Sequence, residues 1–271
     1  MNDLHGEFQR EVSDSVKKIS TDRDFARISK EWMEQSIALR YCYNFSSLGR
    51  PIIQYPTDII ATQEVIWRTK PDLIINTGIA HGGSAILHAS MLALLDFADA
   101  VENGLLLNPA ESKRKVLAID IDIRAHQKEA ISKHPMSIKI DMLEGSSIEN
   151  SMVSQVHEYA KGFSNVMVFL DSNHTAAHVF EELVNYAPLV SKNGYCIVCD
   201  GIIDNLPVNS HPDRPWGPGN SPKTGIKKYL DWLAYEPQKS IDGELINFKI
   251  DKFIEAKSTI TAACDGFLKR L

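Results

Sequence analysis

The sequence lacks several features that would assign it to a special class of protein. It has four cysteines in 271 residues, no internal repeat, no low-complexity segment and no N-terminal apolar stretch of the signal-peptide type. Its basic residues are scattered and its net charge is −6, whereas nucleic-acid binding needs a basic field. We find no apolar run long enough to span a membrane. These absences favour a cytoplasmic protein that acts on a small molecule and binds neither nucleic acid nor membrane.

The few cysteines predict neither a metal site nor a disulfide framework. Cys196 and Cys199 form a closely spaced pair, but no second pair completes a zinc site. Both lie in the apolar run GYCIVCD, so we expect buried thiols rather than a redox centre. A hydrophobic content of 44% is ample for a full core.

Short apolar runs and amphipathic segments alternate along the chain from about residue 70. This alternation predicts an α/β fold with a mostly parallel sheet covered by helices on both faces. The tail, 249–259 and 259–268, predicts an antiparallel strand pair at one sheet edge, which makes seven strands. We expect the other strands at 73–76, 115–120, 137–141, 165–171 and 193–199, and helices at 83–97, 124–133, 148–160, 175–187 and 223–235.

The first part of the chain has a different character. Residues 1–55 are polar, with aromatic and aliphatic side chains at helical intervals, until Gly49-Arg50-Pro51 breaks the pattern. A short helix then leads to Pro71. We interpret 1–55 as a helical cap or partner-binding arm and 56–271 as the main domain, and we expect a homo-oligomer.

The stretch PDLIINTGIAHGGS predicts a strand, a glycine-rich turn and the start of a helix. Gly78, Gly82 and Gly83 allow the backbone to turn sharply and to approach a ligand closely. The helix that follows offers free N–H groups at its N-terminus. The pattern indicates a nucleotide-type cofactor, although an ordinary strand-to-helix turn has the same appearance.

The next expected strand ends in an acidic residue. Asp120 stands where a ribose needs an acceptor for its hydroxyls, and Asp122 could share the role. Asp120 lies about forty residues after the turn, against a usual ~20, and the segment 99–114 predicts an insertion that explains the excess. Alternatively, one or both carboxylates cap the helix after Arg124.

Other polar residues follow the later strands, at the sheet edge where ligands of open α/β folds bind. Ser146 and Ser147 follow the third strand and could contact an adenine edge or cap a helix. Asp171 and Asp200 end two apolar strands, and such a carboxylate pair suits Mg²⁺, although a hydrogen-bonded pair without metal is the alternative. His174 is the natural general base beside them, unless it is merely exposed.

His178, one turn after His174, is expected to support the site rather than act in it. The long loop after Asp200 holds several prolines and a tryptophan before the next helix. Loops of this length are functional lids or disordered segments, and we expect a substrate lid that includes Arg214, Trp216 and Asn220.

Five motifs in this order carry a family resemblance: TGIAHGGS, IDIDIR, EGSSI, LDSNHT and DRPWGPGNSPKT. Together they resemble the cephalosporin hydroxylase (CmcI-like) family of class I S-adenosylmethionine-dependent methyltransferases, over about residues 58–230. The resemblance implies a Rossmann-like fold, with S-adenosylmethionine as cofactor and Mg²⁺ as a possible second one. It implies that Asp171 and Asp200 bind the metal and that His174 is the base.

The same resemblance implies a cofactor site and shows where this chain differs. Members usually carry an acidic residue at Asn76 and a further oxygen ligand beside Asp200, where this chain has Cys199 and Gly201. The implied cofactor residues run from the methionine end through the ribose to the adenine: Asn76, Gly78, His81, Gly82, Gly83, Ser84, Asp120, Asp122, Ser146 and Ser147.

We therefore interpret the chain as a methyltransferase, with Mg²⁺-dependent O-methylation of a sugar or another polyhydroxylated small molecule as the expected reaction. Transfer to nitrogen stays open. Two other readings remain. A metal-dependent oxygenase would need a third facial ligand, which no second histidine-rich motif supplies. A non-catalytic cofactor-binding protein would explain Asn76 and the incomplete metal ligands.

Overall fold

Strands and helices alternate along the chain as the sequence predicts. The computed structural model describes residues 4–271. The strands are β1 (Phe45–Ser47), β2 (Arg50–Ile52), β3 (Leu73–Thr77), β4 (Lys115–Asp120), β5 (Ile140–Glu144), β6 (Val166–Leu170), β7 (Tyr195–Val198), β8 (Phe248–Ile250) and β9 (Phe267–Arg270). The helices are α1 (Leu4–Thr21), α2 (Arg23–Ala38), α3 (Pro56–Thr69), α4 (Gly83–Asn103), α5 (Ala125–Ser132), α6 (Asn150–Ala160), α7 (Ala176–Tyr186), α8 (Pro222–Tyr235) and α9 (Lys252–Ser258).

Seven strands form one sheet in the order β5-β4-β3-β6-β7-β9-β8. The first five strands in this order pair in parallel, and β9 runs antiparallel to both β7 and β8. The expected seven-stranded, mostly parallel sheet is confirmed. The chain proceeds from β3 toward β5 on one side and from β6 toward β7 on the other, so the order reverses beside β3. Ligands of open α/β sheets bind at such a reversal, outside the carboxyl ends of the strands.

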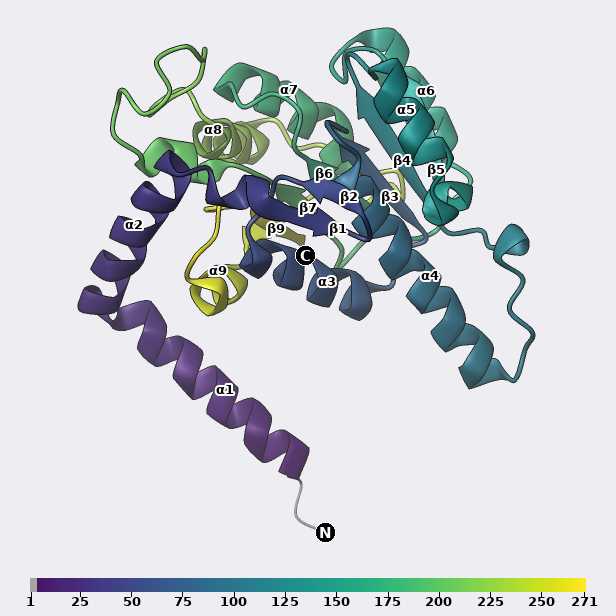
Figure 1. Cartoon of the computed structure of the whole chain (residues 1–271), viewed down its shortest axis with the longest axis horizontal. Helices are drawn as coiled ribbons and strands as arrows, with labels where there is room; N and C mark the ends of the chain where they lie inside the picture. Colours follow the sequence, from purple (N-terminus) through teal and green to yellow (C-terminus); the bar gives the residue numbers. More distant parts are fainter. Residues whose placement is uncertain (1–3) are drawn as a thin grey trace.

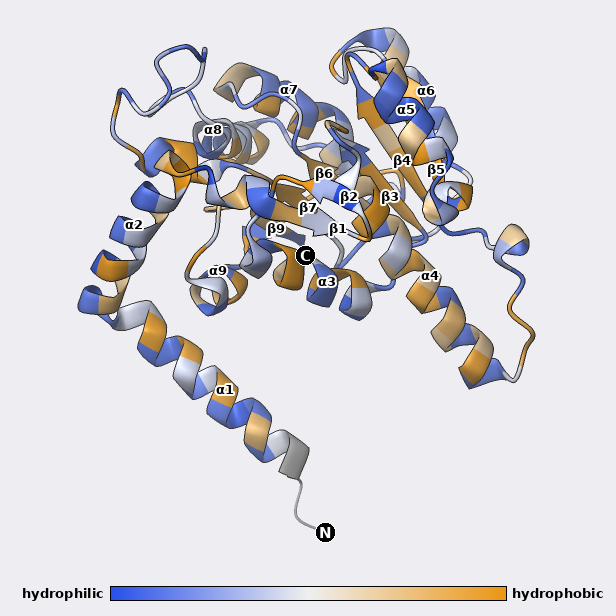
Figure 2. Ribbon diagram, in the orientation of Figure 1, coloured by the Kyte–Doolittle hydropathy of each residue, from blue (hydrophilic) through white to orange (hydrophobic). Residues whose placement is uncertain are grey.

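Helices cover both faces of this sheet (Figure 1). Within β3, Leu73 and Ile75 pack in the core formed with α6, α7 and α8, whereas Ile74 packs in the core formed with α3 and α4. The side chains of a strand point alternately to its two faces, and β3 is buried on both. Figure 2 shows apolar residues concentrated on the strands and on the helix sides that face them. The two cores fix the sheet, and with it the positions of the strand ends.

The C-terminal tail differs from the expectation. An antiparallel pair does close the sheet edge, but it consists of β8 and β9, and residues 252–258 form a helix instead of a strand. The Asp251 side chain accepts the backbone N–H groups of Phe253 and Ile254, which caps this helix at its start. The strand expected at 259–268 was therefore also wrong, since β9 begins only at Phe267.

Two further boundaries differ. The strand expected at 137–141 is β5 at 140–144, because a 3₁₀ turn occupies 135–139. Residues 45–52, expected to end a helical segment, form the β1–β2 hairpin. Its turn places Leu48 and Gly49 at φ values of 45° and 87°, so Gly49 lies within a turn between two strands. The boundary between residues 55 and 56 stays a prediction.

Helix α4 is longer than the expected 83–97 and takes in part of the segment interpreted as an insertion. Among the helices described, it has the length and composition of a membrane span, but 56% of its most apolar window is buried inside the protein. Ile86 and Leu92 are fully buried and pack in the core beside the sheet. The apolar character of α4 is therefore that expected of a core helix.

Candidate active site

The glycine turn after β3 brings the ends of β3 and β6 into contact. Gly78 has φ +83°, and a Cβ atom there would lie 2.0 Å from the carbonyl oxygen of Asp171. Only glycine fits such a close approach of two backbones. The Asn76 side-chain amide donates a hydrogen bond to the Gly78 carbonyl at 2.7 Å. Asn76 itself is fully buried, so its side chain stabilises the turn from inside the protein.

Asp120, at the end of β4, holds the other side of the same turn. Its carboxylate accepts the backbone N–H groups of Ile79 at 2.7 Å and Ala80 at 3.2 Å. Its second oxygen accepts the N–H of Asp122 at 3.2 Å. The Asp122 side chain is 70% exposed and points away from this network toward Arg124. Asp120 thus fixes the shape of the turn, and its role as a ribose acceptor stays a prediction.

Arg50 of the β1–β2 hairpin and Gln54, which follows the hairpin, reach the turn as well. The Arg50 guanidinium donates to the carbonyl oxygen of His81, and the His81 Nδ1 atom lies 2.8 Å from Gln127 Nε2. Gln54 donates to the Ser84 hydroxyl at 3.3 Å. Gly82 has φ +85° and immediately precedes α4, which starts at Gly83. Sequence reasoning missed Arg50 and Gln54, because their contacts depend on a hairpin it did not predict.

The loop after β5 carries the two serines expected near an adenine. The Ser146 carbonyl accepts the N–H of Glu149 at 3.1 Å, so Ser146 takes part in a turn before α6. Ser147 is buried, and its hydroxyl donates to Glu182 of α7 at 2.6 Å. The glycine before them, Gly145, donates its N–H to the Asp120 carbonyl at 2.8 Å. This loop therefore lies directly beside Asp120 at the end of β4.

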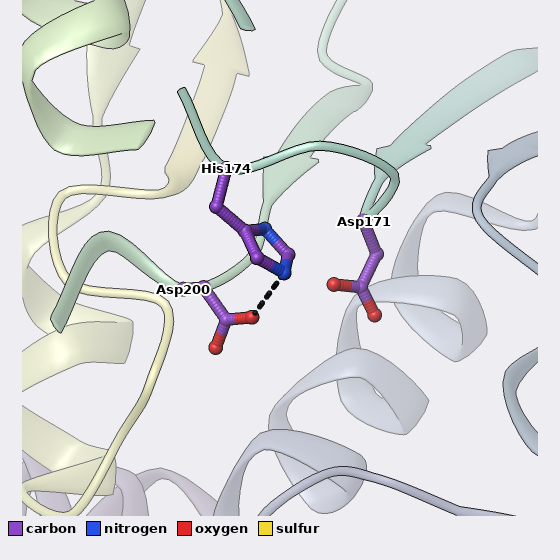
Figure 3. Close-up of side chains that lie close together, drawn as sticks. All are labelled: Asp171, His174 and Asp200. Atoms are coloured by element: carbon purple, nitrogen blue, oxygen red, sulfur yellow. Dashed lines mark ion pairs between the residues drawn. The ribbon is translucent and has the colours of Figure 1, made fainter. Parts of the chain in front are cut away.

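Asp171, His174 and Asp200 come together at the ends of β6 and β7 (Figure 3). Each offers a ligand atom, and these atoms all lie within 4.8 Å of one another. His174 Nε2 is 3.1 Å from Asp200 Oδ2. Burial, and then the nearby charge of Asp200, raise the pKa of Asp171 well above its usual value. Two carboxylates this close are stabilised by a cation or a proton between them.

These three residues line a cavity of about 700 Å³. Part of the lining comes from the ends of β6 and β7, and another part comes from α2 and the 3₁₀ turn that follows it, η1 (Tyr41–Asn44). Sequence reasoning assigned the N-terminal segment as a cap but named none of its residues as part of the site. Those that line the cavity are Glu34, Ile37, Ala38, Arg40, Cys42 and Tyr43.

The long loop after Asp200 covers the same cavity. The Trp216 ring meets the His174 ring edge-on, with centroids 4.9 Å apart, and Arg214 lies 5.2 Å over Trp216. Asn220 accepts the N–H of Ala176 at 3.0 Å and donates to the Pro215 carbonyl at 2.8 Å, which joins the loop to the start of α7. Trp216 therefore contacts His174, Arg214 packs on Trp216, and Asn220 fixes the loop that carries them both.

Comparison with known proteins assigns the chain to a family. The pattern of the family described as rhamnosyl O-methyltransferase/CmcI matches residues 39–271. The chain belongs to this family. The membership confirms the expected CmcI-like methyltransferase and identifies an enzyme.

Individual relatives and a solved structure agree. A rhamnosyl O-methyltransferase of Mycobacterium bovis (strain BCG / Pasteur 1173P2) is 27% identical over 216 residues, which are 79% of this chain and 73% of the relative. One of Mycobacterium leprae (strain TN) is 25% identical over 224 residues, 82% of each chain. A CmcI structure with Mg and SAM has a TM-score of 0.50 at 15% identity and covers 84% of this chain and 77% of that chain. This likeness confirms the Rossmann-like class I methyltransferase fold.

Two side chains that line the cavity of this methyltransferase have raised pKa values that the sequence did not predict. Asp58, in the first turn of α3, accepts hydrogen bonds from Thr261 Oγ1 and from the Ala262 N–H. Burial raises its pKa to about 7. Burial, and then the charge of Asp171, raise the pKa of Cys199 well above its usual value. Cys199 is therefore a neutral thiol, a poor ligand for a hard cation such as Mg²⁺.

Proposed function

We propose that this enzyme transfers the methyl group of S-adenosylmethionine to a hydroxyl of a sugar or similar polyhydroxylated molecule, with help from Mg²⁺. The observation that carries the proposal is the contact between Gly78 and the Asp171 backbone. It puts the glycine turn of the cofactor side directly beside the Asp171–His174–Asp200 cluster of the cavity side. Methyl transfer needs such adjacency, because donor and acceptor must meet in line.

The residues present fit both groups. The turn has left-handed glycines at Gly78 and Gly82, a helix N-terminus at Gly83 and a carboxylate at Asp120, as a nucleoside cofactor requires. Asp171 and Asp200 offer the oxygen ligands that Mg²⁺ prefers. The solved CmcI structure that resembles this chain contains Mg and SAM.

When bound, the cofactor supplies an electrophilic methyl group, and Mg²⁺ lowers the pKa of a hydroxyl that it holds. The protein's own residues orient the acceptor and move its proton. The His174 ring takes the hydroxyl proton, and Asp200, whose Oδ2 lies 3.1 Å from His174 Nε2, stabilises the imidazolium that results. Trp216 covers the edge of the His174 ring and keeps water from that side.

A sugar acceptor is supported by the relatives, which are named rhamnosyl O-methyltransferases. The cavity volume of about 700 Å³ is ample for a saccharide. Family membership speaks against the oxygenase and the non-catalytic alternatives. The cluster also holds one histidine and two carboxylates, whereas the usual non-haem iron set is two histidines and one carboxylate.

The experiment measures methyl transfer from labelled S-adenosylmethionine to a panel of rhamnosides and other glycosides. Transfer should stop with excess chelator and return with Mg²⁺ or Mn²⁺. Asp200→Asn should abolish the metal response, whereas Asp213→Asn, an exposed carboxylate on the loop that follows, should keep it. Full transfer in excess chelator would remove the metal from the proposal, and no transfer to any hydroxyl would overturn it.

We propose further that the enzyme is a cytoplasmic homo-oligomer. All four cysteines are free, as a reducing compartment requires. Trp67 of α3 and Leu94, Phe97 and Val101 of α4 are exposed around one surface hollow, and such patches are typical of protein contacts. Light scattering should give a mass above 30.3 kDa, and Phe97→Asp should reduce it to that of the monomer. A monomeric wild type contradicts the assembly.

A further inference from the structure

A fully buried carboxylate in α7 has no part in the chemistry described so far. Glu182 is 0% exposed, and its Oε1 atom accepts two hydroxyl groups, Ser147 Oγ at 2.6 Å and Ser172 Oγ at 2.7 Å. Within residues 4–271, its Oε2 atom has no hydrogen-bond partner. A buried carboxylate needs partners, and besides the two serines, His178 Nε2 lies 3.6 Å from its Oε1 atom.

His178 completes the cluster. Its Nε2 atom lies 3.1 Å from Ser147 Oγ and 3.2 Å from Ser172 Oγ. Both serine protons are directed to Glu182, because a carboxylate only accepts hydrogen bonds. His178 must therefore donate from Nε2, and each serine oxygen keeps an acceptor position in a fixed direction. The charge of Glu182 thus orders every hydroxyl in the cluster.

The cluster joins two loops that the sheet holds apart. Ser147 follows β5 and Ser172 follows β6, and β4 and β3 lie between these strands. Glu182 of α7 bridges the two loops, because it accepts a hydroxyl group from each. Tyr186, one turn further along α7, donates its hydroxyl to the Ser147 carbonyl and fixes that loop a second time. These contacts join the two loops directly, in addition to the hydrogen bonds that each loop makes with the sheet.

The positions of the two loops relate the cluster to the cofactor. The glycine turn follows β3 and the ribose acid Asp120 ends β4, so the base attached to that ribose extends toward β5. The loop at Ser147 lies there, and Gly145 is bonded to the Asp120 carbonyl. Ser172 directly follows Asp171, beside which the methyl group is transferred. The cluster therefore connects the base end of the cofactor with its reactive end.

We propose that Glu182 is a positioning residue for the cofactor, and that through Ser147 it selects a base with an amino group. The Ser147 oxygen, whose proton is committed to Glu182, presents an acceptor to the base. The exocyclic amino group of adenine is a donor and fits this acceptor, whereas the carbonyl group of hypoxanthine does not. The inference rests on the proposed use of S-adenosylmethionine and goes beyond it by naming what holds and selects the base.

Calorimetry with S-adenosylhomocysteine and with its inosine analogue tests the proposal. Glu182→Gln keeps the size of the side chain and one acceptor oxygen, so it is expected to fold, whereas Glu182→Ala removes the anchor. We expect Glu182→Ala to weaken S-adenosylhomocysteine binding by about 10-fold or more, with Glu182→Gln in between. Binding of the inosine analogue should change much less. Glu181→Gln, an exposed neighbour on α7, is the matched control and should leave both affinities unchanged.

A double-mutant cycle with Ser147→Ala separates positioning from general stability. If Glu182 acts through Ser147, the two losses of cofactor affinity are not additive, whereas a merely structural role lowers the melting temperature and leaves affinity of the folded protein intact. Unchanged affinity in Glu182→Ala, or equal losses for both ligands, overturns the proposal. Failure of the wild type to bind S-adenosylhomocysteine is a different result, since it overturns the proposed function itself.

Discussion

The imidazole of His174 lies between two carboxylates and under an indole, and each neighbour acts on it differently. Asp200 is close enough to stabilise its charged form, and Trp216 limits its contact with water. If His174 is the base that we propose, it contributes to the proton transfer and not to cofactor binding, because the glycine turn lies on the other side of Asp171. The distinction can be measured.

We expect His174→Ala to lower kcat by about 10²–10⁴, the usual share of general base catalysis, with S-adenosylhomocysteine affinity little changed. The remaining activity should rise with pH as hydroxide replaces the base. Steady-state kinetics across pH 5–9 and calorimetry measure the two effects. His126→Ala, an exposed histidine on α5, serves as the control. Turnover within a few-fold of wild type at every pH contradicts the role.

Asp58 gives the stability of the protein a pH dependence. Burial raises its pKa to about 7 from 3.8, so between these values the folded protein holds a proton that the unfolded chain releases. The contribution of Asp58 to the free energy of unfolding therefore falls as pH rises through this window. In Asp58→Asn this loss is absent, and the stability of the variant relative to wild type should increase by about 1–4 kcal/mol from pH 4 to pH 8.

Urea unfolding of both proteins at several pH values in this range measures the difference. The comparison of variant with wild type removes the titration of all other groups. Parallel stability curves would show that Asp58 titrates normally in the folded protein.

The three site carboxylates that the sequence predicted share one property: each lies at or just after the end of a recognisable strand. Asp120, Asp171 and Asp200 were predicted because an apolar run followed by a carboxylate is visible locally. Asp58 was missed because its partner Thr261 is 203 residues away. Glu182 was also missed. On an amphipathic helix, nothing in the sequence distinguishes a buried glutamate from an exposed one.

At the scale of elements, the contact between the glycine turn and the end of β6 predicts that a larger residue at position 78 lowers the stability of the fold. Gly78→Ala introduces a left-handed alanine and a Cβ atom 2.0 Å from the Asp171 carbonyl. We expect a loss of about 2–4 kcal/mol in the free energy of unfolding and weaker cofactor binding. Gly49→Ala is the matched control, because Gly49 has φ +87° and a Cβ atom added there would meet nothing within 4 Å.

The control should lose only the cost of the left-handed conformation, about 1 kcal/mol. Denaturant unfolding compares the two variants. Equal losses would mean that β3 and β6 can separate without cost, and that the contact does not hold the two halves of the site together.

The parallel strands were predicted well because burial on both faces makes them continuous apolar runs. The β1–β2 hairpin was not, because its turn uses Leu48 at positive φ, a conformation that leucine rarely adopts. Helix α9 was taken for a strand because KFIEAKST is too short for its period to be decided. What decides it is the cap at Asp251 and the packing of Ile254 against the core.

At the scale of the whole molecule, the N-terminal segment is a wall of the cavity. Family similarity begins at residue 39, yet Glu34, Ile37 and Ala38 of α2 line the space in front of His174. Helix α1 continues away from this wall along α9 (Figure 1). Removal of α1 and removal of α2 should therefore have different effects on the use of the acceptor.

Deletion of residues 1–38 should lower kcat/KM for the acceptor by about 10-fold or more through lost contacts, with S-adenosylhomocysteine affinity within about 3-fold of wild type. Deletion of 1–21 alone should leave both unchanged. Ile37→Ala, a smaller change in the same wall, should act in the same direction as the longer deletion. Kinetics and calorimetry on the three variants decide the matter, and an unaffected acceptor kcat/KM in the longer deletion would show that α2 is not part of the acceptor site.

A cavity wall supplied by the N-terminal segment also has an evolutionary consequence. The sheet, the glycine turn and the carboxylate cluster all follow residue 39, so a single recombination event upstream can exchange α1 and α2 without interrupting them. If α2 forms part of the acceptor site, as the deletion tests, such an exchange alters which acceptors fit while the residues proposed for methyl transfer are retained. Replacement of one short coding segment would then change the acceptor range and leave the core unchanged.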